Sequence, residues 1–213
     1  MPYYQNYARM IRIVGIFITA LAGLIICGCA GTNIVTYAIV RKPPLCQMQS
    51  APESALVLWG PAWRENQKEV ALREEIAARA IDQLFTTAPC YSKVEVLKSV
   101  AGRSAIELSD AEALKFAVAS NGGYDKIIIL RVEELGPVVM LHPSPILWEG
   151  GTEVVLRIRV LNTKTSSLEA DVTSHWKNGG AFILKGTKTL ERDMEAVLTS
   201  VLWKVRVPII EYG

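Results

Sequence analysis

The residues that could carry catalysis are few in this chain, and no spacing between them is typical of an enzyme. Only two histidines occur, His142 and His175, and the sequence holds neither Gly-x-Ser-x-Gly nor His-Glu-x-x-His. Glu133 and Glu134 are adjacent on a predicted strand, so their side chains point to opposite faces, and we expect a solvated strand end. The sequence therefore predicts a protein that is not an enzyme and that needs no metal and no cofactor.

The four cysteines are the next residues with chemistry of their own. Cys27 and Cys29 flank a single glycine at the end of an apolar run, whereas Cys46 and Cys90 are the only two others. In an oxidising compartment the second pair can form a disulfide. Two unpaired buried thiols are the alternative, because the sequence does not give the distance between the two Cα atoms.

The first cysteines end a segment with the layout of a secretory signal peptide. Two arginines precede an apolar run over residues 13–26, and small residues follow it. The residues Ile26-Cys27-Gly28-Cys29 resemble a lipobox, which has an aliphatic residue three positions before the cysteine and a small one just before it. The resemblance implies that residues 1–28 are removed and that Cys29 becomes a lipidated N-terminus carrying acyl chains such as palmitate.

A single uncleaved transmembrane helix is the alternative for the same segment. No charged residue occurs between Ile13 and Val40, which is long enough to cross a bilayer. Either way the basic N-terminus stays inside, so the remainder faces the periplasm. In the sorting rule that the lipobox resemblance brings with it, an aspartate after the cysteine retains a lipoprotein at the inner membrane. Ala30 stands there instead, which indicates the outer membrane.

The rest of the chain predicts one domain behind an anchor. Residues 29–53, with Pro43, Pro44 and Pro52, are predicted to be a flexible tether. Residues 54–213 are enough for a single periplasmic domain with a sizeable core. Without the two signal arginines, the chain has 21 basic and 21 acidic residues. Such a balance does not favour a nucleic-acid partner, which requires a clustered basic face.

One stretch, Gly136–Gly151, is unlike ordinary surface. It joins two predicted strands but is far longer than a usual hairpin loop of about 2–5 residues. Its apolar residues are Met140, Leu141, Ile146, Leu147 and Trp148, set among three prolines. We predict that they form a partner-binding surface, because prolines reduce the cost of ordering such a loop. The alternative is that the strand extends to Leu141 and the apolar residues fold back over the core.

Hydrophobic periodicity gives the elements that must position these residues. The predicted order is β-α-β-α-β-β-β-α, an α/β (α+β) fold in which helices pack on a mixed sheet. Ser109-Asp110-Ala111-Glu112 is a capping box that opens a helix with Leu114, Ala117 and Val118 on one side. The other predicted elements are a strand over 55–59, a helix to Phe85, strands over 93–97, 127–130, 152–161 and 168–176, and a helix over 190–205.

Two arginines on the predicted strand 152–161 allow two interpretations. Arg157 and Arg159 would form an anion site if they converged on a ligand. Antiparallel pairing with the following strand would instead place them near Glu169 and Asp171 and neutralise them. The presence of these carboxylates favours a solvated sheet face with ion pairs.

The element order resembles the periplasmic α/β domain of the TolB amino-terminal type. The run Tyr124-Asp125-Lys126-Ile127-Ile128-Ile129 resembles its aspartate and central strand, and Arg159-Val160-Leu161-Asn162-Thr163-Lys164-Thr165 resembles its strand-to-turn segment. Ser166 stands where that type often has glycine. The domain type recurs in the curli secretion lipoprotein, in lipoprotein activators of peptidoglycan synthases and in an exopolysaccharide-export lipoprotein. The resemblance covers residues 54–205 and concerns fold more than function.

These observations leave three classes of function. The first is a non-catalytic accessory subunit of an envelope complex for secretion, polysaccharide export or wall synthesis, anchored in the membrane by its N-terminal lipid. It would dock onto other proteins or form a homo-oligomer. The second is a module that binds a small ligand or glycan in a groove lined by Trp59, Trp148 or Trp176. The third is a hydrolase that uses His142 or His175 with a carboxylate and a hydroxyl.

Overall fold

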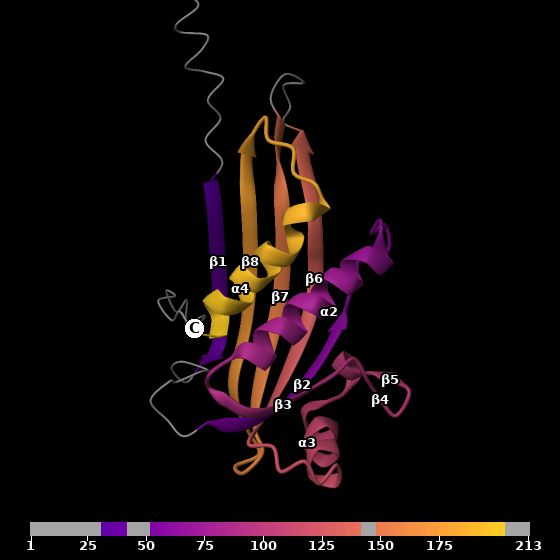
Figure 1. The fold of residues 1–213 in the computed structure, drawn as a ribbon, viewed down its shortest axis with the longest axis vertical. Coiled ribbons are helices and arrows are strands. Elements are labelled where there is room, and N and C mark those ends of the chain that lie inside the picture. The colour runs from indigo at the N-terminus through magenta and orange to yellow at the C-terminus, as the bar shows by residue number, and fades with distance from the viewer. Residues whose placement is uncertain (1–30, 42–51, 142–147, 203–213) are drawn as a thin grey trace, which may run out of the picture.

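A six-stranded mixed sheet organises the molecule (Figure 1). The computed structural model describes residues 31–41, 52–141 and 148–202. Strand order is β1-β8-β7-β6-β2-β3; β2 is parallel to β3 and β6, and the other neighbours are antiparallel. The strands are β1 (Gly31–Arg41), β2 (Glu53–Pro61), β3 (Tyr91–Leu97), β6 (Lys126–Leu141), β7 (Trp148–Asn162) and β8 (Ser167–Ala181).

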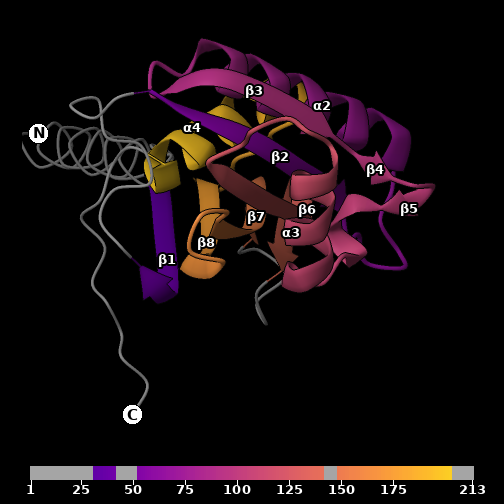
Figure 2. The same cartoon turned by 90° about the horizontal axis from the view of Figure 1, so that it is seen from below.

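Two helices cover one face of this sheet and enclose the main core. They are α2 (Val70–Thr87) and α4 (Leu190–Leu202), which lie on the same side (Figures 1 and 2). Their apolar stripes, including Ile81 and Met194, pack on sheet residues such as Leu130. The predicted α/β class and the order of its elements are thereby confirmed, with crossovers in the first half and hairpins in the second.

The opposite face has a smaller core beneath α3 (Asp110–Ala119). The central strand predicted over 127–130 is buried on both faces, since Ile128 contributes to the main core and Ile129 to this one. The predicted capping box is present, with Ser109 and Glu112 bonded reciprocally. A small hairpin of β4 (Ser99–Val100) and β5 (Arg103–Ser104) and the 3₁₀ turn Ala105–Glu107 precede α3. The helix face differs from the prediction, because Val118 is 72% exposed.

The prediction of a tether over 29–53 is wrong for its first part. Gly31–Arg41 forms β1, an edge strand antiparallel to β8. The segment is rich in β-branched residues, but an edge strand also needs a neighbour that presents hydrogen-bonding groups. Here that neighbour is β8, which comes more than a hundred residues later in the chain. Local sequence patterns do not contain this information.

The stretch Gly136–Gly151 is mostly strand. β6 continues to Leu141, β7 begins at Trp148, and the two are paired up to the Leu141–Trp148 register pair. The alternative of an extended strand is therefore correct for the described part of this stretch. The second half of that alternative is wrong, because Val139, Met140 and Leu141 are exposed and do not cover the core.

Candidate functional site

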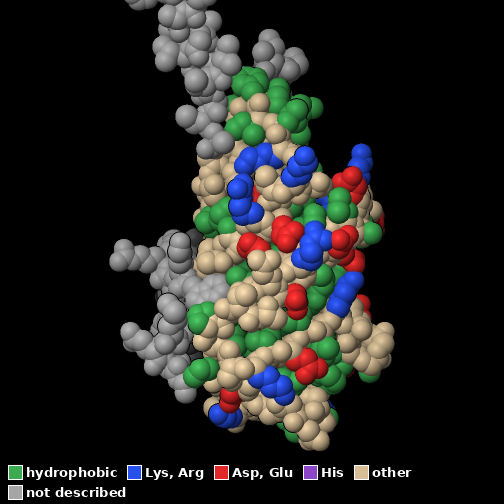
Figure 3. Space-filling model, viewed as in Figure 1, with side chains coloured by type: hydrophobic (Ala, Val, Ile, Leu, Met, Phe, Trp, Pro, Cys, Tyr) green, Lys and Arg blue, Asp and Glu red, His purple; other side chains and the backbone are tan. Residues whose placement is uncertain are grey.

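Exposed apolar side chains gather at the end of the sheet where β6, β7 and β8 end. We call this surface the apolar tip; its residues are Val139, Met140, Leu141, Trp148, Phe182 and Leu184. Leu141 is 79% and Leu184 76% exposed, while Trp148 is half-buried. The tip forms the cap of hydrophobic side chains in Figure 3. Large apolar residues are common singly on surfaces, but a contiguous group of them marks a contact site.

The tip is held together by the β6–β7 hairpin and by the chain that follows β8. Leu141 lies opposite Trp148 in the sheet register. The backbone N–H of Phe182 donates to the carbonyl of Trp148 at 3.1 Å. The two aromatic rings meet edge to face, with their centroids 5.8 Å apart. Trp148 is thus fixed at the tip by neighbours from both sides.

Two glycine pairs allow this arrangement. Gly150 lies opposite Gly180, and Gly151 opposite Gly179. A Cβ atom on Gly150 would lie 2.1 Å from the carbonyl oxygen of Ile183, so a larger residue would push away the segment after β8. The glycine pairs therefore allow the backbones of β7, β8 and the segment after β8 to pack closely.

The structure brings together three of the five residues predicted to bind a partner, namely Met140, Leu141 and Trp148. Ile146 and Leu147 lie outside the described residues, as do Cys29 and Cys46. Sequence reasoning missed Phe182 and Leu184. The signal was an apolar triplet, Phe182-Ile183-Leu184, that begins two positions after the glycine pair Gly179-Gly180.

Positive charge lies just below the tip. Figure 3 shows Lys and Arg side chains gathered beneath the hydrophobic cap. Lys185 and Lys188 come one and four positions after Leu184, and within the described part of the chain neither forms an ion pair. Lys177 lies on β8 and is paired with Glu149 at 3.3 Å. The apolar tip is therefore bordered by unneutralised lysines.

A second surface is the part of the sheet opposite α2 and α4 that α3 does not cover. We call it the uncovered face; it consists of β1, β8, β7 and the far half of β6, and no described helix lies over it (Figure 2). Arg157 forms two bonds to Asp171, at 3.0 and 2.7 Å, and this carboxylate raises the pKa of Arg157 above its ordinary value. The ion-paired interpretation is correct for Arg157, whereas Arg159 bonds Asp110 at 2.6 Å.

A hollow of about 210 Å³ lies where the uncovered face meets the layer of α3. Its lining consists of Ile106, Ile129, Arg131, Arg157 and Arg159. Arg131 lies directly opposite Arg157 in the β6–β7 register, which places two like charges side by side. The nearest described carboxylate to Arg131 is Glu133, at 3.6 Å. Sequence reasoning identified Arg157 and Arg159 but missed Arg131.

His175 is also on the uncovered face, at the outward position that the strand pattern predicts. Its ring nitrogen Nε2 contacts the carboxylate of Glu153 on β7. Among the described residues, no hydroxyl is hydrogen-bonded to this imidazole, and His142 lies outside them. The described residues also contain no cluster of three or more potential metal ligands.

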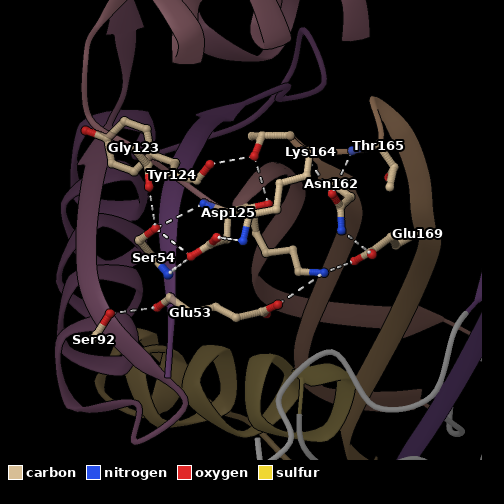
Figure 4. Close-up of polar contacts among 12 residues, drawn as sticks. Glu53, Ser54, Ser92, Gly123, Tyr124, Asp125, Asn162, Lys164, Thr165 and Glu169 are labelled. Carbon is tan, nitrogen blue, oxygen red and sulfur yellow. Dashed lines mark hydrogen bonds and ion pairs between the residues drawn. The ribbon is translucent and has the colours of Figure 1, made fainter. Parts of the chain in front are cut away.

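A polar cluster lies at the end of the sheet opposite the tip (Figure 4). It contains a hydroxyl, a carboxylate and a lysine, which are residue types that occur in catalytic sites. Asp125 accepts from the backbone N–H of Ser54 at 2.9 Å and forms an ion pair with Lys164 at 2.7 Å. The Ser54 hydroxyl is buried and already bonded to Asp125 and to the carbonyl of Gly123. A nucleophile needs a reachable, uncommitted oxygen. The cluster therefore connects β2, β6 and the β7–β8 turn.

Glu134 is not part of a solvated strand end. A bulge between Val132 and Glu134 shifts the register, and the side chain of Glu134 is buried. It accepts from Gln67 at 2.7 Å and from the buried Arg73 at 3.2 Å. Arg73 belongs to α2, so this pair attaches the helix to the central strand.

Two other predictions from the sequence concern a ligand groove lined by tryptophan and a disulfide. Trp59 and Trp176 are buried in the main core, so neither can line the predicted ligand groove, whereas Trp148 lies half-buried at the apolar tip. Cys90 is disulfide-bonded, and its partner lies outside the described residues. The pairing with Cys46 stays a prediction.

Comparisons with known proteins give fold likenesses only. No protein-family model and no curated protein matches the chain. The PelC dodecamer from Paraburkholderia phytofirmans matches with 13% identity and a TM-score of 0.46, over 83% of this chain and 99% of that one. Lipoprotein GNA1162 from Neisseria meningitidis matches with 16% identity and a TM-score of 0.41, over 70% of this chain and 98% of that one. At these identities and TM-scores, the likenesses carry no inference about this chain's function.

The described helices are α2, α3 and α4, together with short 3₁₀ turns. None of them combines the length and the apolar content that crossing a bilayer requires.

Proposed function

We propose that this protein is a non-catalytic accessory subunit of a cell-envelope complex, facing the periplasm and anchored in the outer membrane through an acylated Cys29. The arginine-lined hollow in the uncovered face is the observation that supports a partner contact. Arginine forms planar, two-bond contacts with carboxylates and is enriched at the centres of protein interfaces. The proposed partner is an envelope protein that inserts an acidic side chain into this hollow.

The charges around the hollow favour such a contact. Two arginines directly opposite one another destabilise a strand pair unless negative charge lies close to both. Asp171 supplies it for Arg157, but among the residues that the structure describes Arg131 has only Glu133 at 3.6 Å, and the side chains of Arg131 and Glu133 are substantially exposed. A carboxylate from a partner would complete the hydrogen bonding of Arg131 without breaking an existing bond.

The proposed anchor would also fix where this face lies. β1 begins at Gly31, two residues after Cys29, and forms one edge of the uncovered face. A sheet attached so closely to its lipid stays near the membrane surface. It could contact the membrane-proximal part of a secretion, polysaccharide-export or wall-synthesis machine.

Photo-crosslinking in intact envelopes tests the proposed contact. A photoreactive residue at Val155 lies on the same strand face as Arg157, and one at Leu72 on α2 serves as the matched control on the helical side. We expect a discrete crosslinked product at position 155 that falls several-fold with Arg131→Glu. Arg192→Glu, an exposed change on α4, should leave the product unchanged. Equal crosslinking at both positions, or no effect of Arg131→Glu, would contradict the proposal.

An acidic small ligand or glycan is the second candidate for the same hollow. The three arginines that line the hollow would also bind the carboxylate of an acidic sugar. Calorimetric titration of the purified protein with a uronic acid distinguishes the two. Saturable binding that Arg131→Glu abolishes, together with unchanged crosslinking at Val155, would favour the ligand-binding module.

A further inference from the structure

We infer that the apolar tip lies against the lipid bilayer that holds the anchor, and that this second contact fixes the orientation of the domain. The inference rests on the proposed anchoring at Cys29. The tip is thereby a second contact site, and its partner is a lipid surface. The sequence had predicted a partner protein for the same apolar residues.

The sheet register places the tip and the start of the chain at the same level. Gly31, Gly179, Gly151 and Val138 are partners in one row across the four strands (Figure 1). Two residues of chain span at most about 7 Å, so Cys29 lies within that distance of this row. Strands β6 and β7 continue past the row by about the same length, at roughly 3.4 Å per residue. The tip therefore reaches as far toward the membrane as the anchored residue can.

The distance across the sheet leads to the same conclusion. β1 and β6 are separated by two strands, so their axes are about 14 Å apart at roughly 4.8 Å per step. A bilayer surface that holds Cys29 extends far beyond this distance in every direction. Unless the domain tilts strongly away, the end of the β6–β7 hairpin must meet that surface.

The side chains at the tip suit an interface between water and lipid. Leu141 and Leu184 are largely exposed, and Phe182 is 45% exposed. Trp148 packs beside Phe182, and tryptophan is enriched at membrane interfaces because its ring is amphipathic. Burying these side chains in the outer part of the acyl region removes apolar surface from water.

The charges below the tip complement an anionic lipid surface. Lys185 and Lys188 have no ion-pair partner within the residues that the structure describes. They come one and four positions after Leu184, so they lie beside the apolar side chains that would enter the lipid. Apolar side chains bordered by lysines are the pattern of interfacial membrane contacts. A protein partner at this position would have to compete with the membrane for the tip.

A fluorescent label at Leu141 tests this inference on the full, naturally processed protein. The variant Leu141→Cys is labelled with an environment-sensitive dye and reconstituted into phosphatidylcholine–phosphatidylglycerol vesicles with bromine on the acyl chains. The matched control is Val118→Cys, an equally exposed position on α3 near the opposite end of the molecule. An unchanged thermal midpoint shows that each variant is folded.

We expect the label at position 141 to shift to shorter wavelength and to be quenched several-fold more strongly than the label at 118. Lys185→Glu with Lys188→Glu should reduce this quenching. Equal quenching at the two positions would overturn the inference. So would a label at 141 that is shielded in native envelopes but not in pure lipid vesicles, because that result assigns the tip to a protein. Loss of crosslinking at Val155 would instead refute the proposed docking and leave the tip contact intact.

Discussion

At the scale of single residues, Asp125 connects three segments that are far apart in the chain. Its carboxylate binds the start of β2 through Ser54 and the β7–β8 turn through Lys164, while its own backbone directly precedes β6 (Figure 4). The ion pair with Lys164 and the bonds from Ser54 lower the pKa of Asp125 to about 2 from its ordinary 3.8. The carboxylate is therefore charged in the folded protein at neutral pH.

This lowered pKa predicts an acid-sensitive contribution to stability. Because the folded pKa lies below the unfolded one, the contribution is complete above about pH 4 and is lost as the pH falls toward about 2. Asp125→Asn should lower the urea midpoint at neutral pH, and the difference from the unmodified protein should shrink between these two values. Asp82→Asn, an exposed change on α2, is the control. A difference that stays constant with pH would contradict the assignment.

At the scale of elements, the contact between α2 and β6 combines apolar packing with one buried ion pair. Arg73 donates to the carbonyl of Leu135 at 2.5 Å and to Glu134 at 3.2 Å. The guanidinium lies directly over Gly136, where a Cβ would be 1.6 Å from its Nη1 atom. Glycine is required there because the arginine fills the space that a side chain would need.

Gly136→Ala should therefore displace Arg73 and leave Glu134 buried without its strongest partner. Removing one member of a buried pair costs about 3–5 kcal/mol, and we expect the free energy of unfolding to fall by about this amount in denaturant titrations. Gly186→Ala is the matched control, since a Cβ there meets nothing within 4 Å, and its effect should stay within about 0.5 kcal/mol. Equal effects of the two variants would show that Arg73 finds another position at no cost.

Local patterns were sufficient for most elements of the fold. The buried strand at Ile127–Leu130, the capping box at Ser109 and the strand-to-turn segment before Ser166 all follow from neighbouring residues. Ser166 has a positive φ of 51°, a backbone conformation that glycine adopts most readily. By contrast, β1 depends on pairing with β8, and the tip depends on Phe182 packing on Trp148 and on Ile183 lying over Gly150. Long-range contacts of this kind leave only weak local signals.

At the scale of the whole molecule, the cysteines connect folding with export. Cys90 is disulfide-bonded and lies between α2 and β3. If the signal peptide is removed with Cys27, and Cys29 is acylated, Cys46 is the single remaining partner. The lipid anchor and the disulfide therefore support one another as predictions.

Peptide mass mapping without reduction should show both features in protein isolated from envelopes. We expect an N-terminal peptide that begins with acylated Cys29, and a Cys46 peptide linked to the Cys90 peptide. Cys46→Ser should lower the free energy of unfolding by about 2–4 kcal/mol, through the greater freedom of the unfolded chain. An intact Met1, an unmodified Cys29, or Cys90 linked to a different cysteine would contradict the scheme.

The position of β1 has a mechanical consequence. The strand leaves the proposed anchor and runs the length of the sheet, paired with β8 from Gly31 to Arg41. Tension between the membrane and a bound partner would act along the axis of this strand. Hydrogen bonds between antiparallel strands lie perpendicular to that axis, so the load falls on the whole ladder at once and cannot open it pair by pair. A domain attached in this way resists being pulled from its membrane by shear, because ten of the 11 residues of the strand have partners on β8 and share the force.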